Sequence, residues 1–145
     1  MYKHILAATD GSKLSQKAIR SAVSLARSVG ARVTGVYVIS AYMPPPFGGD
    51  SPGVSASRFK QALAEGAAIA LAAAAKEAEA AGVPFASVTI SNAQPWEGII
   101  STAKNKKCDL IVLGSHGRGG LSSLLLGSET SKVLAHSALP VLVCR

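Results

Sequence analysis

Two kinds of hydrophobic pattern alternate along the chain. Short runs that are almost continuously apolar or rich in β-branched residues predict buried strands, and they fall at residues 2–10, 32–39, 83–90, 109–113 and 139–144. Two longer segments, at residues 15–29 and 57–81, repeat apolar residues every three or four positions, as an amphipathic helix does. Residues 94–106 and 128–136 are predicted to form a third and a short fourth helix. The pattern therefore predicts strands and helices in strict alternation.

Glycine and proline support the ends of these segments. Gly30 and Gly82 follow the first and second predicted helices, where a glycine readily adopts the left-handed conformation that ends a helix. Pro95 falls in the first turn of the third helix, where its missing N–H costs no hydrogen bond. Residues 40–54 are rich in proline and glycine, above all from Met43 to Pro52, and predict a long surface loop with no assigned role.

Strands that alternate with helices predict an α/β fold. Continuously apolar strands indicate a parallel sheet covered by helices on both faces, and right-handed crossovers make it one doubly wound domain over residues 1–145. Ligands of such domains bind beyond the carboxyl ends of the strands, where the strand order changes direction. If the five strands are ordered 3-2-1-4-5, the ends of the first and fourth strands meet at that point.

Both of these strand ends carry polar and flexible residues. The first strand ends in residues 9–12 (TDGS), and the fourth opens the stretch 114–130, which holds five glycines and five hydroxyl side chains. Glycines let backbone N–H groups approach an anion, and Gly127 leads into a helix whose N-terminus favours phosphate. The hydroxyls of Ser128 and Thr130 would add two donors. The stretch therefore predicts a phosphate-binding site.

Better-known nucleotide motifs are absent from the sequence. It contains no GxxxxGK[ST] loop, and GSHGRG lacks the GxGxxG spacing of a dinucleotide site. A magnesium-dependent receiver domain of similar size would need further acids beside Asp10, whereas residues 9–13 read TDGSK. The predicted phosphate site therefore belongs to a different type.

Composition narrows the class of protein. With 48% hydrophobic and 16% charged residues, the chain is expected to form a globular domain without a membrane span or signal peptide, and therefore to reside in the cytoplasm. Cys108 and Cys144 lack CxxC spacing, which predicts reduced structural thiols. His4 and His136 lie too far apart in sequence to suggest a metal site. We expect neither a metal ligand nor a catalytic residue.

The net charge of +7 admits several kinds of partner. The tight basic cluster Lys104, Lys106 and Lys107 falls at the end of a predicted helix, where cations complement the helix dipole. Aromatic residues make up 5% of the chain and do not interleave with basic ones, so the stacking surface of a single-strand binder is missing. Nucleic acid is accordingly not an expected partner; such binding would weaken steeply with salt.

The glycine spacing resembles a known family. Gly114-x-x-Gly117, nine residues, then Gly127-Ser128 matches the G-x-x-G-x9-G-[ST] pattern of the nucleotide-binding branch of the universal stress proteins. The TDGS turn, the order of elements and the closing PVLVCR are also similar, so the resemblance covers essentially the whole chain. One departure is the turn at residues 92–95, which reads NAQP where the family often has Gly-x-Pro.

The resemblance implies the strand order 3-2-1-4-5 and a binding site for an adenine nucleotide. Asp10 would lie by the ribose or base, Val38 would pack on adenine, and Gly117 would approach the ribose and phosphates. The full set of implied binding residues is Ala8, Thr9, Asp10, Val38, Leu113, Gly114, His116, Gly117, Arg118, Gly127, Ser128, Glu129 and Thr130.

The resemblance also implies a ligand, a partner and a role. The expected ligand is ATP, or AMP or ADP, with Mg²⁺ on the phosphates. The expected partner is a second copy of the chain, paired through the C-terminal strand at Val141 and Val143, and the expected role is that of a stress-responsive sensor or regulatory module. Two alternatives stay open: a slow ATPase or phosphotransfer enzyme, and a dimeric interaction module that needs no nucleotide.

Several of these residues also have a plain structural interpretation. Asp10 suits the cap of the turn that follows the first strand. His116 is interpreted as an exposed loop side chain rather than a general base. Arg118 is equally well explained as a phosphate contact and as a solvated charge. Trp96 is interpreted as a packing residue of the third helix.

Overall fold

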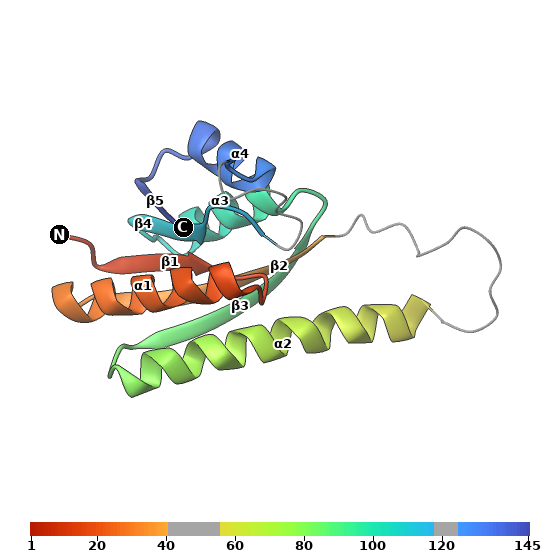
Figure 1. The fold of residues 1–145 in the computed structure, drawn as a ribbon, viewed down its shortest axis with the longest axis horizontal. Helices are drawn as coiled ribbons and strands as arrows, with labels where there is room; N and C mark the ends of the chain where they lie inside the picture. Colours follow the sequence, from red (N-terminus) through yellow and green to blue (C-terminus); the bar gives the residue numbers. More distant parts are fainter. Residues whose placement is uncertain (41–55, 118–124) are drawn as a thin grey trace.

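The computed structural model describes residues 1–40, 56–117 and 125–145; the Pro-rich segment Met43 to Pro52 and Arg118 lie outside these ranges. A five-stranded sheet in the order β3-β2-β1-β4-β5 forms the centre, and all neighbouring strands are parallel (Figure 1). The predicted α/β fold and strand order are confirmed. The elements are β1 (His4–Ala8), α1 (Lys13–Val29), β2 (Arg32–Ser40), α2 (Ala56–Ala80), β3 (Phe85–Asn92), α3 (Pro95–Asn105), β4 (Leu110–Gly114), α4 (Ser128–His136) and β5 (Val141–Cys144).

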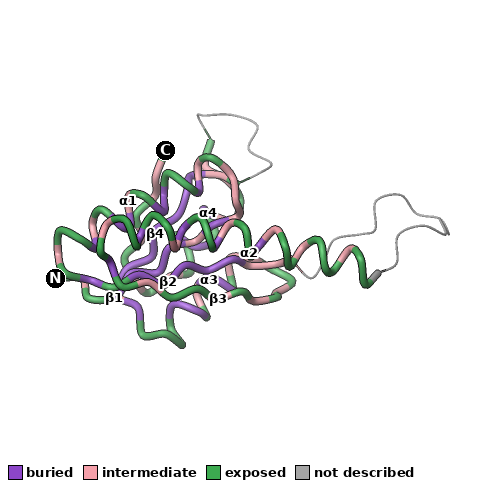
Figure 2. The backbone as a smooth tube through the Cα atoms, turned by 90° about the horizontal axis from the view of Figure 1, so that it is seen from below, coloured by how far each residue is buried: buried purple, intermediate pink, exposed green. Residues whose placement is uncertain are grey.

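Each face of the sheet is covered by its own apolar layer. Helices α1 and α2 pack on one face, where the core includes Ile5 and Val33 from the strands and Ala22 and Ala78 from the helices. Helices α3 and α4 pack on the other face around Leu6, Val36, Ile99 and Val133. Buried residues gather in the central strands β1, β2 and β4 (Figure 2). Burial on both faces explains why these strands read as continuous apolar runs.

Local sequence sets the ends of helix α1. Ser12 caps its N-terminus by accepting the Ser15 backbone N–H at 3.2 Å. Gly30 ends it with a φ of 69°, a left-handed conformation that glycine adopts without the strain caused by a Cβ atom. The predicted glycine stop is therefore confirmed.

Strand β3 begins two residues later than the sequence pattern predicts. Gly82 has a φ of 67°, and the Val83 N–H donates to the Ala78 carbonyl at 2.9 Å, so residues 81–83 complete the end of helix α2. The Pro84 carbonyl is the first group to bond to the sheet, where it accepts the Val33 N–H at 2.9 Å. The described β3 contains no fully buried residue. An edge strand that is only partly covered explains why its apolar pattern is the weakest of those predicted.

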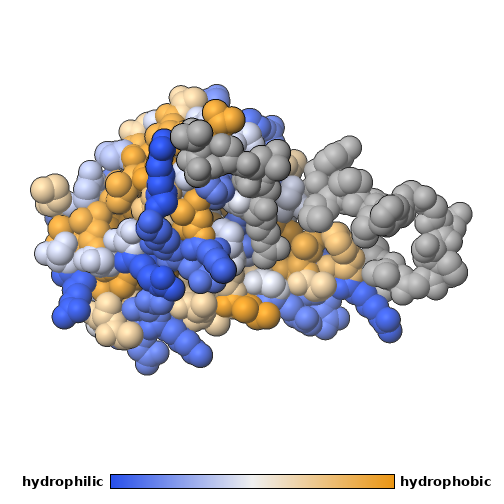
Figure 3. All heavy atoms as spheres, viewed as in Figure 1, coloured by the Kyte–Doolittle hydropathy of each residue, from blue (hydrophilic) through white to orange (hydrophobic). Residues whose placement is uncertain are grey.

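In the described part of the chain, no helix is both long and apolar enough to cross a membrane. The face shown in Figure 3 intersperses hydrophilic and hydrophobic side chains.

Candidate functional site

A pocket of about 390 Å³ lies beyond the carboxyl ends of β1 and β4, and we call it the carboxyl-end pocket. The tertiary structure brings together in its wall every predicted binding residue except Arg118, which lies outside the described residues. These wall residues are Ala8, Thr9, Asp10, Val38, Leu113, Gly114, His116, Gly117, Gly127, Ser128, Glu129 and Thr130. Their role in binding stays a prediction.

Hydroxyl groups fix the turn after β1. Thr9 Oγ1 lies 3.0 Å from Ser15 Oγ and accepts the Gly11 N–H at 3.2 Å. Asp10 Oδ1 accepts the Ser12 N–H at 2.9 Å, so Asp10 does cap this turn as its structural interpretation requires. That role does not remove Asp10 from the pocket, because the same carboxylate lines the pocket wall.

Gly117 lies so close to the Asp10 side chain that it leaves no room for a side chain of its own. A Cβ atom on Gly117 would lie 2.5 Å from Asp10 Oδ2, which is far inside van der Waals contact. A Cβ on Gly127 would meet backbone as well, 3.0 Å from His116 Cα and 3.1 Å from Ser115 O. The absence of side chains therefore lets Gly117 lie close to Asp10, after β1, and lets Gly127 lie close to Ser115 and His116, after β4.

Backbone hydrogen bonds tie Gly127 to Ser115 and Ser115 to the end of β5. The Gly127 N–H donates to the Ser115 carbonyl at 2.7 Å, and the Ser115 N–H donates to the Cys144 carbonyl at 2.7 Å. Thr130 Oγ1 donates to the Gly114 carbonyl at 2.8 Å, and Thr130 is buried. Its single hydroxyl proton is directed at Gly114 in this arrangement, and the expectation that Thr130 donates to phosphate stays a prediction.

His116 is not the exposed side chain that its loop position predicts. It is half-buried in the pocket wall, and its Nδ1 lies 3.1 Å from the Ser115 hydroxyl. Gly127 lies directly against this residue, because a Cβ on Gly127 would touch His116 Cβ at 3.2 Å.

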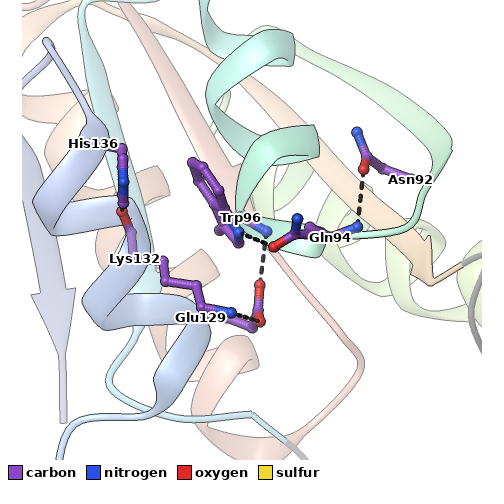
Figure 4. A network of polar contacts seen from close by, with 6 residues as sticks. All are labelled: Asn92, Gln94, Trp96, Glu129, Lys132 and His136. Atoms are coloured by element: carbon purple, nitrogen blue, oxygen red, sulfur yellow. Dashed lines mark hydrogen bonds and ion pairs between the residues drawn. The ribbon is translucent and has the colours of Figure 1, made fainter.

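Glu129 joins the two helices on this side of the sheet (Figure 4). Its Oε2 accepts the Trp96 backbone N–H at 2.8 Å, in the first turn of α3, where Gln94 provides no side-chain cap. Its Oε1 lies 3.6 Å from Lys132 Nζ. A carboxylate at a helix N-terminus is favoured by the exposed N–H groups and the helix dipole. The sequence motif does not reveal this contact because its two residues come from separate helices.

Trp96 is a packing residue of α3, as its sequence position predicts. Its indole N–H donates to Gln94 Oε1 at 2.8 Å, and its ring lies 4.5 Å from the His136 ring, centroid to centroid. It also packs against the core beneath α3 and α4. The turn at residues 92–95 reads NAQP, which differs from the usual family sequence. Here Asn92 Oδ1 accepts the Gln94 N–H at 2.9 Å, and this hydrogen bond stabilises the turn without a glycine.

Sequence reasoning missed four residues of the pocket wall, namely Ser15, Val36, Pro95 and Ile99. Val36 was recognisable in principle, because it lies two positions before Val38 and faces the same side of the strand. Pro95 and Ile99 reach the pocket only through the packing of α3, for which the motif contains no signal. Together with Val38, these apolar residues form a wall suited to a flat ring.

The charge of the described pocket wall is negative. It contains the carboxylates of Asp10 and Glu129, and no Lys or Arg lies among its described members. Gly127 supplies no side-chain cap to α4, so the first-turn N–H groups of that helix are the main positive feature of the wall. Within the described ranges, no group of three or more His, Cys, Asp or Glu side chains is placed to hold a metal ion.

Comparison with known proteins identifies relatives over the full chain. The family model described as the universal stress protein family matches residues 1–145. A universal stress protein of Thermus aquaticus is 36% identical over 145 residues, covering 100% of both chains. Universal stress protein YxiE of Bacillus subtilis is 34% identical over 157 aligned positions, again covering 100% of both.

Solved structures agree with these relatives. Universal stress protein UspA from Lactobacillus plantarum superposes with a TM-score of 0.78 at 30% identity, covering 99% of this chain and 98% of that one. A universal stress protein in complex with cAMP has a TM-score of 0.74 at 25% identity, covering 99% and 97%. A universal stress protein from Archaeoglobus fulgidus in complex with dAMP shares the fold, with a TM-score of 0.65 at 20% identity, covering 100% and 98%.

Proposed function

The chain belongs to the universal stress protein family, and we propose that it binds an adenine nucleotide in the carboxyl-end pocket and acts as a stress-responsive regulatory module. The observation that supports the proposal is the convergence of the predicted binding residues on one pocket of about 390 Å³. A pocket of roughly 300–1,000 Å³ is the usual size for a small-molecule site. A relative solved with cAMP makes an adenine nucleotide the natural class of ligand.

The pocket offers a different surface to each part of a nucleotide. The apolar side chains of Val36, Val38 and Ile99 suit the faces of adenine. The Asp10 carboxylate is an acceptor for ribose hydroxyls, as it would be in other nucleotide sites. The close-packed backbone at Gly117 and the N-terminus of α4 suit phosphate oxygens.

We propose ATP with Mg²⁺ as the physiological ligand. Because the described wall carries two carboxylates, a triphosphate needs added positive charge, and a divalent cation on its phosphates supplies that charge. Ser128 lines the pocket at the start of α4, and we expect its hydroxyl to approach the phosphate end of the ligand. AMP and ADP carry fewer charges and are the direct comparison.

The first experiment is a thermal-shift titration with ATP, ADP, AMP and GTP, each with and without magnesium. A ligand at about 100 times its Kd stabilises the fold by roughly 2.7 kcal/mol, or several degrees in Tm for this size of domain. We expect that shift with adenine nucleotides and none with GTP. Mass spectrometry of small molecules released from the denatured protein supplies an independent test. No shift and no released nucleotide would favour an interaction module without nucleotide.

Product analysis of the ATP sample separates binding from turnover. A pure binding module leaves ATP intact over hours, whereas steady release of ADP that stops in a variant of the phosphate end of the pocket would establish the slow ATPase instead.

We also propose a homodimer paired through the outer edge of β5. The Pro140 and Cys144 carbonyls accept the Ile111 and Ser115 N–H groups at 3.0 and 2.7 Å, so these carbonyls face β4. Because backbone direction alternates along a strand, Val141 and Val143 turn their N–H and carbonyl groups toward the open edge. That edge is a template for pairing with a second strand, and Leu142 is partly exposed beside it.

Proline substitution tests this edge selectively. Val143→Pro removes an outward N–H and leaves the bonds between β4 and β5 in place, so we expect a folded monomer. Val143→Ala is the control and should stay dimeric. Mass from light scattering gives the result, and circular dichroism verifies the fold. A Val143→Pro protein that remains a dimer would exclude pairing through this edge.

A further inference from the structure

A second hollow lies at the opposite end of the sheet, where β1, β2 and β3 begin. It measures about 350 Å³, and we call it the amino-end hollow. Neither the glycine motif nor the proposed nucleotide site extends to it. Its lining residues are His4, Arg32, Val33, Thr34, Pro84, Phe85, Ala86 and Lys106.

The hollow contains a buried histidine whose hydrogen bonding is incomplete. His4 is 7% exposed, and its Nε2 lies 2.8 Å from the Oγ1 of the buried Thr34. His4 Nδ1 is buried and has no hydrogen-bond partner among the described residues. The Lys106 backbone carbonyl lies near enough to favour the protonated ring without completing a hydrogen bond to Nδ1. Native structures rarely leave such an atom unsatisfied.

Positive charge surrounds this histidine. Arg32 and Lys106 line the hollow, and neither forms an ion pair within the described part of the chain. The neighbouring acid is turned elsewhere, because Asp109 accepts the Lys3 and His4 backbone N–H groups at 2.8 and 3.1 Å. The two cations therefore have no counter-charge of their own in the hollow.

We propose that the amino-end hollow binds a small phosphate monoester, with Arg32 and Lys106 pairing with the phosphate and Pro84 and Ala86 contacting its apolar body. The guanidinium group presents paired N–H donors that match phosphate oxygens, and the ammonium group adds a point charge. Pro84 and Ala86 are exposed and offer apolar contact beside these charges. The two charges of one phosphate monoester balance the two cations, so the hollow does not require a ligand with more phosphates.

Ligand binding in this place has a specific consequence for His4. Burial lowers the pKa of His4 below its usual value of 6.5, and the charges of Arg32 and Lys106 lower it further, while Asp109 and the Lys106 carbonyl raise it. A bound dianion offsets the two cations, so it raises the pKa of His4 and favours uptake of a proton. No comparable change is expected if the anion binds elsewhere.

Histidine NMR tests the proposal, because His4 lines the amino-end hollow and His116 lines the carboxyl-end pocket. Phenyl phosphate is titrated into the full-length protein at pH 7.5, and the His4 and His116 ring signals are followed separately. We expect a saturable shift at His4, with affinity lowered about tenfold in Arg32→Gln and in Lys106→Gln. Lys104→Gln is the control, because it removes the same charge from α3 without lining the hollow.

A pH titration with sodium sulfate, which keeps its charge in this range, supplies the second readout. We expect the pKa of His4 to rise by about half a unit or more, which corresponds to a roughly threefold coupling. Shifts confined to His116 would mean that the anion binds only in the carboxyl-end pocket and would overturn the proposal. Equal weakening by Lys104→Gln would overturn it too, because it would show diffuse surface attraction. Neither outcome would touch the proposed nucleotide site.

Discussion

The carboxyl-end pocket and the amino-end hollow lie at opposite ends of the same parallel sheet and carry side chains of opposite charge. The described wall of the pocket carries two carboxylates, Asp10 and Glu129, and the groups that we propose for an anion there are glycine backbone and the start of α4. The hollow carries Arg32 and Lys106 and lies where α3 ends. In an alternating α/β fold, helices begin at the carboxyl ends of strands and end at the amino ends.

That polarity explains the difference in side chains. Helix N-termini present N–H groups to a phosphate, so the carboxyl-end pocket can hold acidic side chains and still attract an anion. Helix C-termini present carbonyl groups, which repel an anion, so the amino-end hollow needs cationic side chains. The two sites should therefore respond differently to sterics, charge and pH.

The largest expected effect is steric and falls on the carboxyl-end pocket. Gly117→Val places a side chain where even a Cβ would lie 2.5 Å from Asp10 Oδ2, and we expect nucleotide affinity to fall more than about 100-fold, roughly 2.8 kcal/mol. Gly66→Val is the control, because a Cβ there meets nothing within 4 Å. Calorimetry measures binding. Normal affinity in a folded Gly117→Val protein would contradict the site, and phosphate binding at the amino-end hollow should be unchanged.

The two cysteines report separately on the two ends of the sheet. Cys108, just before β4, is buried, and burial raises its pKa to about 11, so only about one part in a thousand is thiolate at pH 8. Cys144 is half-buried at the end of β5. We expect iodoacetamide to modify Cys144 more than tenfold faster, as measured by mass spectrometry of digested protein. Equal rates would show that the amino end of β4 opens readily.

Acid should weaken the fold through the amino-end hollow. Because burial lowers the pKa of His4, the unfolded chain binds the proton more tightly, and stability is lost as pH falls from the usual histidine value of 6.5 through the lowered one. The loss is at most about 1.4 kcal/mol per pH unit for one group. Denaturant unfolding between pH 7.5 and 5.5 should show a smaller loss in His4→Gln than in wild type. His136→Gln, at an exposed position, should behave as wild type.

The smallest expected effect comes from a substitution that removes one negative charge from the carboxyl-end pocket. Glu129→Gln keeps an oxygen for the Trp96 N–H but loses its repulsion of phosphates, so we expect ATP affinity to rise two- to fivefold, about 0.5–1 kcal/mol. AMP should gain less because it carries fewer charges. Glu97→Gln is the matched control, since Glu97 lies in the first turn of α3 outside the pocket wall. An unchanged ATP affinity would show that Glu129 acts only as the cap of α3.

Much of the fold was predictable because its signals are local. The sequence pattern identified every strand and helix, and Ser12 begins helix α1 and Gly30 ends it through conformations that depend on near neighbours. The pocket wall was predictable to the extent that it follows the glycine motif and the ends of β1 and β4. The start of β3 was misplaced because residues 81–83 bond back to the end of α2.

The sequence by itself determined which segments become strands and helices, and it indicated that the ends of β1 and β4 meet over a glycine-rich turn. Only the tertiary structure decided which partners the polar side chains take: Thr130 donates to Gly114, Glu129 caps α3 at Trp96, and His4 is enclosed beside two cations. The physical reason is range. Periodicity and turn chemistry act over a few residues, whereas hydrogen bonds and charge pairs depend on distances between elements that are far apart in the chain.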